Sequence, residues 1–307
     1  MILKNYSEKS YEMFDITFRG TSDFVSHLKS APTAEVFASA NLASKRSNDD
    51  SIKFTKTGSL EQAIEMFEYG WNDGFDSFLS AKKQLDKIFP HIAKKLVLQN
   101  NVVGSIPNVF NAINNIPLSM RKKVLEEKKN VISMNVDVSY PWFINSQQLF
   151  NFGAIVLSCI DFFESMGYRV CLNFFEIARS GNQMIYIKNT LKEDGAKSNM
   201  QKLYFPFCHS SYLRRLLFRV LETTDGLGYH WMSGYGYIMK INEIREALDI
   251  SAETLLFSLY SMGIEGKDIV EDAQRVVDCI KLGDYLNINE NVYTVCDNHN
   301  VLTKKRK

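Results

Sequence analysis

The second half of the chain alternates between strand-like and helix-like spacing of its apolar residues. The segment "NVISMNVDVS" (130–139) predicts a strand, and "SQQLFNFGAIVLSCIDFFESM" (146–166) predicts a helix buried against a sheet, since it is apolar on nearly all sides. Two apolar runs, 168–178 and 183–189, flank the turn Ser180-Gly181-Asn182 and should form an antiparallel hairpin. The alternation continues with a helix at 210–224, a helix at 242–249, a strand at 253–261 and a helix at 268–283. We therefore predict an α/β fold with helices on both faces of a mostly parallel sheet.

The N-terminal third has a less regular pattern and predicts a mixed α+β region. Residues 14–20 alternate as a strand does. Ser59 and Gln62 form a capping-box pattern at the start of a long helix, which we expect to run to about residue 89. The predicted organisation is an N-terminal region packed on the core (1–128), an α/β domain (129–302) and a basic tail (303–307).

A nearly neutral composition limits the functions that charge alone could drive. The 307 residues include 36 Lys and Arg against 35 Asp and Glu, a formal net charge of +1, so any affinity for nucleic acid or membrane must come from a local patch. The five cysteines have no C-x-x-C spacing, which supports neither a zinc site nor a disulfide framework. The chain starts without a signal-peptide pattern, and its most apolar window, around 150–163, is too short to span a bilayer. These features predict a cytoplasmic protein.

The order of elements around Asp137-Val138-Ser139 resembles the von Willebrand factor A (vWA) fold. An Asp-x-Ser pair ends the first core strand, and an antiparallel hairpin follows the first long helix. In vWA domains an Asp-x-Ser-x-Ser loop at this place, with a Thr and an Asp from two other loops, can bind a divalent cation that takes a carboxylate from the partner. The resemblance therefore implies a Rossmann-like three-layer fold and makes Asp137 and Ser139 candidate metal ligands.

The motif for such a metal site is incomplete in this sequence. Pro141 stands where the second serine belongs, and it offers no side-chain oxygen. The third loop should follow residues 253–261, where Ser258 and Ser261 are the only small polar groups. Mg²⁺ prefers about six oxygen ligands, including one or two carboxylates. Asp137 and Ser139 are thus predicted to form a degenerate Mg²⁺ site, and a metal-dependent hydrolase of nucleic acid or nucleotides would need further carboxylates nearby.

Several phrases are similar to an uncharacterised family encoded largely by bacteriophages and related mobile elements. They are "YGWNDGF" (69–75), "GSIPNVFNAINNIPLSM" (104–120), "NVDVSY" (135–140), "GAIVLSCIDFFESMGYRV" (153–170) and "SSYLRRLLFRVLE" (210–222). That family has no biochemical activity known to us. The resemblance therefore implies a fold and a viral origin, with the cytoplasm of an infected bacterial host as the location.

The loop after Asp137 is the first candidate binding site, because open α/β sheets bind ligands beyond the carboxyl ends of their strands. We expect Asp137, Ser139, Tyr140 and Trp142 to contact a host or viral protein, with Trp142 as an exposed anchor. In the alternative interpretation Trp142 packs on the N-terminal region and Asp137 caps the following helix. The first functional hypothesis is a non-enzymatic protein-binding protein.

The helix at 210–224 suggests a second hypothesis, that of a nucleic-acid-binding protein. Arginine forks match phosphate oxygens, and aromatic rings offer platforms on which bases stack. In the alternative interpretation the arginines pair with acids such as Glu222, and the aromatic loop covers the core. The candidate nucleic-acid-binding residues are Arg214, Arg215, Arg219, His230 and Trp231.

The sequence contains no familiar catalytic motif. It has no G-x-S-x-G elbow, no H-E-x-x-H helix and no P-loop. We therefore predict no catalytic residues and no cofactor beyond a loosely held Mg²⁺. The sequence does not determine the oligomeric state.

Overall fold

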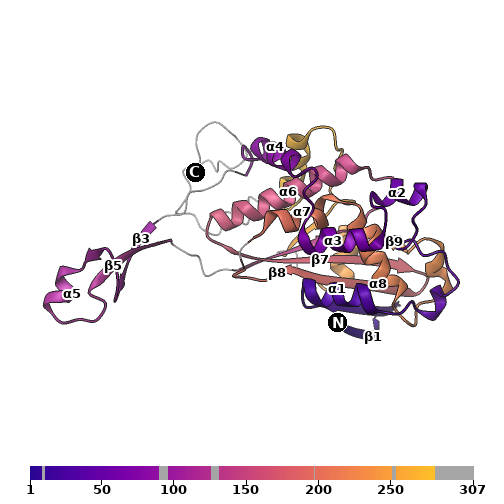
Figure 1. The fold of residues 1–307 in the computed structure, drawn as a ribbon, viewed down its shortest axis with the longest axis horizontal. Helices are drawn as coiled ribbons and strands as arrows, with labels where there is room; N and C mark the ends of the chain where they lie inside the picture. The colour runs from indigo at the N-terminus through magenta and orange to yellow at the C-terminus, as the bar shows by residue number, and fades with distance from the viewer. Residues whose placement is uncertain (9–10, 90–95, 126–130, 197, 251–253, 281–307) are drawn as a thin grey trace.

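The computed structural model describes residues 1–8, 11–89, 96–125, 131–196, 198–250 and 254–280 of the chain. A seven-stranded sheet runs through the body in the order β1-β2-β8-β7-β6-β10, with the short β9 paired to β7. Figure 1 shows helices packed over this sheet and a second, three-stranded sheet that lies apart from it. The strands of the main sheet are β1 (Ile2–Glu8), β2 (Tyr11–Phe18), β6 (Val131–Asp137), β7 (Arg169–Ser180), β8 (Gln183–Lys192), β9 (Tyr237–Ile238) and β10 (Leu255–Ser258).

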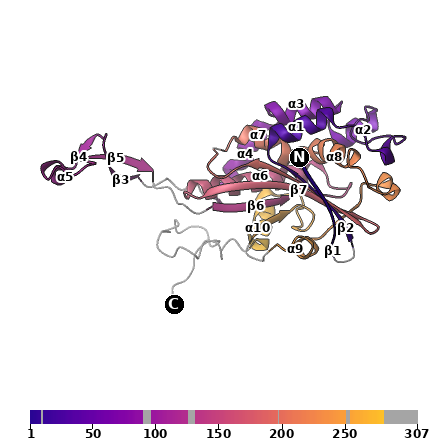
Figure 2. The ribbon, with the colours of Figure 1, turned by 90° about the horizontal axis from the view of Figure 1, so that it is seen from below.

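Most helices of the body lie on one face of the main sheet, as Figure 2 shows from a second side, whereas α9 packs on the other face. None of the described helices is long and apolar enough to cross a membrane. The short turns are η1 (Glu35–Phe37), the π-helical η2 (Tyr212–Leu217) and η3 (Tyr229–Ser233). The helices of the body are α1 (Thr21–Ser30), α2 (Asp49–Thr55), α3 (Leu60–Tyr69), α4 (Phe75–Leu85), α6 (Ser146–Ser165), α7 (Met200–Cys208), α8 (Phe218–Glu222), α9 (Ile241–Ala247) and α10 (Ile269–Cys279).

The strand pairing confirms the predicted hairpin and the predicted α/β class. β7 and β8 are antiparallel neighbours, and β6 runs parallel to β7 on one side and to β10 on the other. β2 is parallel to β8, and β1 is antiparallel to β2 at the far edge. The sheet is therefore mixed but largely parallel, and the carboxyl ends of β6 and β10 meet at one edge.

The N-terminal third contributes both strands and helices to the body. The predicted strand at 14–20 lies largely within β2, which belongs to the same sheet as β6. The predicted cap is confirmed, because the Ser59 side chain accepts a hydrogen bond from the Gln62 amide at 3.1 Å. The single long helix is wrong, however. α3 ends at Tyr69, because the next residue, Gly70, has a φ of 99° that leaves the helical region. α4 begins only after Gly74, whose φ is 83°.

α6 is the central helix of the large core. Its first turn is fixed by Asn145, whose side-chain oxygen accepts hydrogen bonds from the Gln147 and Gln148 amides, both at 2.9 Å. Gly153 lets α6 approach α7 closely, since a Cβ there would overlap Cys208 Sγ. This packing fixes where the loop between β6 and α6 can lie.

The last predicted elements are present with altered boundaries. The helix expected at 210–224 is observed as η2 followed by α8, and the strand expected at 253–261 is the shorter β10. α10 ends at Cys279. Gly283, where the sequence predicted the helix end, and the basic tail (303–307) lie outside the described residues.

The small sheet has the order β3-β5-β4 and carries one short helix. We call residues 96–125 the arm. Gly104 lets the chain pass directly over β5, because a Cβ at this position would overlap the Arg121 carbonyl oxygen. The elements of the arm are β3 (Leu96–Asn101), β4 (Ile106–Pro107), α5 (Val109–Ile113) and β5 (Met120–Leu125).

Candidate functional site

Asp137 is the last residue of β6 and is fully buried. Its Oδ1 accepts a hydrogen bond from the Ser139 amide at 2.9 Å, and its Oδ2 accepts one from the Ser258 hydroxyl at 3.0 Å. Burial raises the pKa of Asp137 to about 7, although the hydrogen bonds from Ser139 and Ser258 oppose this rise. The carboxyl group thus ties the loop after β6 to the end of β10.

Ser139 extends the attachment of this loop along β7. Its hydroxyl donates to the Ile177 carbonyl at 3.3 Å and accepts from the Ile177 amide at 3.2 Å. These contacts replace the backbone pairing that ends with β6. The polar groups of Asp137 and Ser139 are therefore engaged in hydrogen bonds within the protein and are not presented to solvent.

The next residue, Tyr140, is also buried, and its hydroxyl donates to the Ser210 carbonyl at 3.4 Å. Asp137, Ser139 and Tyr140 are therefore 0%, 2% and 7% exposed. This corrects the expectation that these three side chains face a partner. Their buried side chains hold the loop in place, and of the four candidates only Trp142 is exposed.

Sequence reasoning missed a second buried acid, Glu176 in β7. Burial, and in second place the charge of Asp137, raise the pKa of Glu176 to about 8. Within the described part of the chain, Glu176 Oε2 has no hydrogen-bond partner. The available signal was a lone acid in the apolar run "VCLNFFEIA" (170–178). Burial thus favours the protonated form of Glu176.

Trp142 and Phe143 form the exposed part of the loop. They are 79% and 59% exposed, and their rings meet edge to face with centroids 6.0 Å apart at 82°. Phe54, near the end of α2, is 38% exposed. We call Phe54, Trp142 and Phe143 the aromatic rim.

Arg214 joins the two segments that carry the aromatic rim. Its guanidinium donates to the Phe54 carbonyl at 2.7 Å and to the Trp142 carbonyl at 3.3 Å. Its Cζ lies 3.9 Å from the centroid of the Phe54 ring and 5.1 Å from that of Tyr140. The buried Arg214 side chain thus connects the two backbone segments that carry the aromatic rim.

The arginines predicted to form a nucleic-acid-binding face point into the protein. Arg214, Arg215 and Arg219 are 6%, 0% and 4% exposed. Carbonyl and hydroxyl oxygens of this chain accept hydrogen bonds from all three guanidinium groups, so these buried groups are not presented to phosphates. Arg214 donates to Phe54 and Trp142, and Arg215 donates to Ser44, Arg46 and Thr57. Arg219 donates to Ala31 and Thr33.

The aromatic loop after α8 covers the end of the hairpin. Trp231 is fully buried and donates its indole N–H to Gln183 Oε1 at 3.1 Å. His230 is exposed and lies beside Gly181. Trp231 is therefore a core residue and not a platform for bases.

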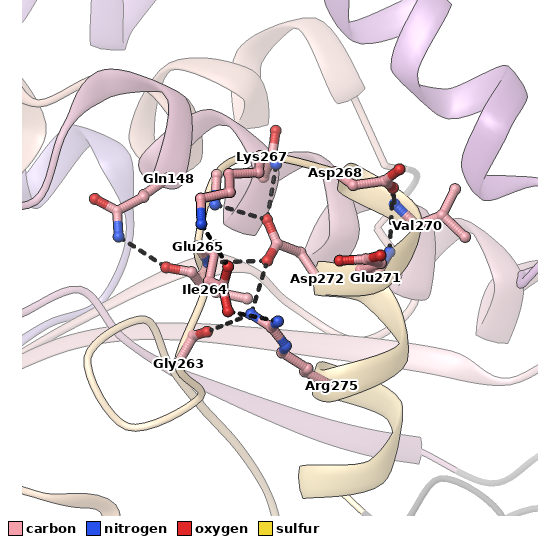
Figure 3. Close-up of polar contacts among 12 residues, drawn as sticks. Gln148, Gly263, Ile264, Glu265, Lys267, Asp268, Val270, Glu271, Asp272 and Arg275 are labelled. Atoms are coloured by element: carbon pink, nitrogen blue, oxygen red, sulfur yellow. Dashed lines mark hydrogen bonds and ion pairs between the residues drawn. The ribbon is translucent and has the colours of Figure 1, made fainter.

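The loop after β10 is fixed at the same edge of the sheet, as Figure 3 shows. Asp272 accepts hydrogen bonds from the Glu265 amide at 2.9 Å, the Gly266 amide at 3.0 Å and the Asn151 side chain at 2.8 Å. Gln148 donates to the Ile264 carbonyl at 2.8 Å. The first turns of α6 and α10 are thus joined through this loop, which gives the edge a defined shape.

A comparison with protein families assigns the chain to one of them. A family model described as a domain of unknown function (DUF7192) matches residues 5–284. The chain belongs to this family. No curated protein and no solved structure shows a significant match. The match begins within β1 and extends past α10, so the DUF7192 unit includes β2, the arm and the edge that carries the aromatic rim.

The oxygen atoms around Asp137 in this DUF7192 chain do not fit a divalent ion. Asp137 already accepts hydrogen bonds at both oxygens, and the Ser139 hydroxyl is engaged by the Ile177 backbone. Across the described residues, no three His, Cys, Asp or Glu side chains gather as a metal site would require. With one carboxyl group in contact with serine hydroxyls, the set falls short of the oxygen shell that Mg²⁺ prefers.

We expect millimolar Mg²⁺ or Mn²⁺ to leave the thermal unfolding midpoint of the protein unchanged within about 1 °C. A ligand that binds only the folded state would raise this midpoint by mass action. The measurement is a thermal unfolding scan with each metal and with EDTA, on the wild type and on Asp137→Asn. A metal-dependent rise that Asp137→Asn abolishes would contradict the expectation.

Proposed function

We propose that this protein is a non-enzymatic binding protein that recognises a protein partner through the aromatic rim. The observation that carries the proposal is the exposure of Trp142 and Phe143 on a loop fixed from inside by Arg214 and Asp137. Rigid aromatic side chains that lose little entropy on binding are enriched at the centres of protein interfaces.

The position of the rim supports the same proposal. It follows the carboxyl end of β6, the place where open α/β sheets bind ligands. We further propose that the domain is vWA-like, because β8, β7, β6 and β10 follow one another in the sheet with β7 and β8 antiparallel. On the resemblance to a phage-encoded family, the proposed partner is a host or viral protein.

No reaction is proposed for the buried acids. Asp137 and Glu176 are 0% and 2% exposed, and burial favours their neutral forms. General acid–base catalysis requires a group within hydrogen-bond reach of a substrate proton. The two acids are proposed to shape the edge of the sheet beneath the aromatic rim.

A photo-reactive residue at the rim tests the proposal. We expect benzoylphenylalanine in place of Phe143 to form a discrete covalent adduct with one protein in cells of the source organism. The same probe in place of Tyr69, which is 72% exposed at the end of α3, should not form that adduct. Adding Trp142→Ala to the Phe143 probe should reduce the adduct severalfold, because the anchor is removed.

Nuclease treatment separates the two functional classes. An adduct that survives nuclease supports protein recognition. An adduct that nuclease removes, with binding that weakens steeply as salt is added, would show that the rim binds nucleic acid instead. Equal adducts from the Phe143 and Tyr69 probes would also overturn the proposal.

A further inference from the structure

The outer end of the arm is a protruding apolar surface. Figures 1 and 2 both show α5 at the end of the arm that lies farthest from the main sheet. We call residues 102–119 the tip, and of these only Asn108 is buried. Exposed apolar surface of this kind marks an interaction site. The large apolar side chains of the tip that are more than 60% exposed are Val102, Val103, Val109, Phe110 and Ile113.

The apolar surface of the tip is not confined to one face. Val102 and Val103 are neighbours in the loop after β3, and Val109 and Phe110 are neighbours in α5. Neighbouring side chains point in different directions, about 100° apart around a helix, yet both members of each pair are exposed. A flat protein surface would cover one side of the tip, whereas a fluid apolar phase surrounds it.

Hydrogen bonds within the tip prepare its backbone for apolar surroundings. The Asn111 side chain donates to the Leu118 carbonyl at 3.3 Å, and the Asn114 side chain donates to the Phe110 carbonyl at 2.8 Å. Unpaired backbone groups are costly to transfer out of water. These polar groups are therefore paired within the tip, while its apolar side chains stay exposed.

The charged residues of the arm are all basic and directly follow the tip. No charged residue occurs from 96 to 120, and the next three residues, Arg121, Lys122 and Lys123, are basic and lie on β5. In the sequence, residues 90–130 contain seven Lys or Arg and two Glu, a net charge of +5, against +1 for the whole chain. The rest of the chain therefore carries the difference, a net charge of −4. An anionic partner is thus favoured at the arm and not at the body.

An anionic lipid bilayer fits both the apolar tip and the basic residues that follow it. Segments that bind at a bilayer surface bury their apolar side chains roughly 5–10 Å into the boundary between headgroups and acyl chains, with basic residues at the headgroups. Arg121 and Lys123 are two residues apart, about 7 Å along a strand, so the basic residues fit within the headgroup layer when the tip is inserted. Phe110 is the only aromatic residue of 96–125, so the arm lacks the stacking surfaces that bind nucleic acid.

We propose that the arm attaches this protein to the surface of an anionic phospholipid bilayer. The apolar side chains of the tip enter the boundary between headgroups and acyl chains, and Arg121, Lys122 and Lys123 contact the headgroup phosphates. Figures 1 and 2 show the arm on the side of the molecule away from α2, which carries Phe54 of the aromatic rim. The attachment therefore leaves the aromatic rim accessible to its own partner.

Co-sedimentation of the full chain with phospholipid vesicles tests the proposal. We expect binding to vesicles of equal parts phosphatidylcholine and phosphatidylserine that weakens as salt is added, and much weaker binding to phosphatidylcholine alone. Each basic residue near an anionic surface strengthens binding about fivefold. The triple variant Arg121→Gln, Lys122→Gln, Lys123→Gln should therefore bind the mixed vesicles at least about 30-fold more weakly.

A matched control makes the same change of net charge in the body. The triple variant Lys4→Gln, Lys83→Gln, Lys87→Gln removes three exposed lysines and should bind the mixed vesicles as wild type does. Circular dichroism and the unfolding midpoint show whether each variant is folded. A wild-type chain that does not bind the mixed vesicles would overturn the proposal, and so would a folded arm variant that binds them as tightly as wild type.

A tryptophan at the tip measures insertion independently of affinity. The three natural tryptophans lie in the body, so the fluorescence that Phe110→Trp adds to that of wild type comes from the tip. On the mixed vesicles this added emission should move to shorter wavelength, and lipids brominated in their acyl chains should quench it. Binding without such quenching would contradict insertion of the tip. A chain that ignores vesicles but binds single-stranded RNA through Arg121, Lys122 and Lys123 would show that the arm recognises nucleic acid instead.

Discussion

Replacing Arg215 by alanine is expected to lower the free energy of unfolding by about 3–5 kcal/mol, the range found when a buried charged network is broken. Arg215 is fully buried, and its guanidinium donates to the Thr57 hydroxyl and carbonyl, both at 2.7 Å. It also donates to the Ser44 carbonyl at 2.8 Å and the Arg46 carbonyl at 3.0 Å. Alanine leaves these buried oxygens without donors and opens a cavity between η2 and the segment before α3.

Urea denaturation of three variants measures this effect. Arg215→Lys keeps the charge but loses the planar fork, so we expect it to cost at least about 2 kcal/mol. Arg19→Ala, which removes an exposed arginine, should change stability by less than about 0.5 kcal/mol. If Arg215→Ala stays within about 1 kcal/mol of wild type, Arg215 does not hold these segments together.

The ionisation of two buried acids is expected to lower stability as the pH rises from about 6.5 to 9. The folded-state pKa values of Glu176 and Asp137 are raised to about 8 and about 7 by burial, so the folded state holds protons that the unfolded state releases. At pH values between the unfolded-state pKa near 4 and the folded-state pKa, these two groups bind fewer protons in the unfolded chain than in the folded protein. These two acids therefore contribute a negative slope of stability against pH, and their loss is complete above about pH 8. Burial lowers the pKa of His209 to about 4, which contributes a slope of the opposite sign below about pH 6.5.

Glu176→Gln isolates the larger of these two titrations. The neutral amide removes the cost of ionising a buried acid, so at pH 9 the variant should be roughly 2–4 kcal/mol more stable than wild type. At pH 5, where Glu176 is neutral in the folded state, the difference should be small. Glu65→Gln, at an exposed position on α3, should keep the wild-type pH profile. Parallel pH profiles for wild type and Glu176→Gln would contradict the account.

Local patterns were sufficient to predict most strands and helices of the second half, although α7 was not predicted. The hairpin around Gly181 and the buried helix after Asn145 depend on turn chemistry and periodicity within a few residues. The break between α3 and α4 carried a signal as well, in Gly70 and Gly74. Apolar spacing continues across both glycines, so periodicity alone predicted one helix where there are two.

The orientation of the polar residues could not be predicted, because it depends on contacts between distant parts of the chain. Arg215 is buried by residues that precede it by more than 150 positions, so a local pattern cannot distinguish it from a solvated arginine. The buried carboxyl group of Asp137 accepts a hydrogen bond from Ser258 on β10, 121 residues later in the sequence. The Ser258 hydroxyl, which the sequence placed in the third metal-binding loop, thus donates to the Asp137 carboxyl group.

Once the partner is identified, the dissociation constant of its complex with this protein, measured for wild type and for rim variants, tests the proposed function most directly. Calorimetry should show that the double variant Trp142→Ala, Phe143→Ala binds at least about 30-fold more weakly than wild type, since anchors of this kind carry 2 kcal/mol or more. Both side chains are exposed, so the unfolding midpoint should not change, and Tyr69→Ala should bind as wild type does. A folded double variant that binds within threefold of wild type would show that recognition occurs elsewhere on the molecule.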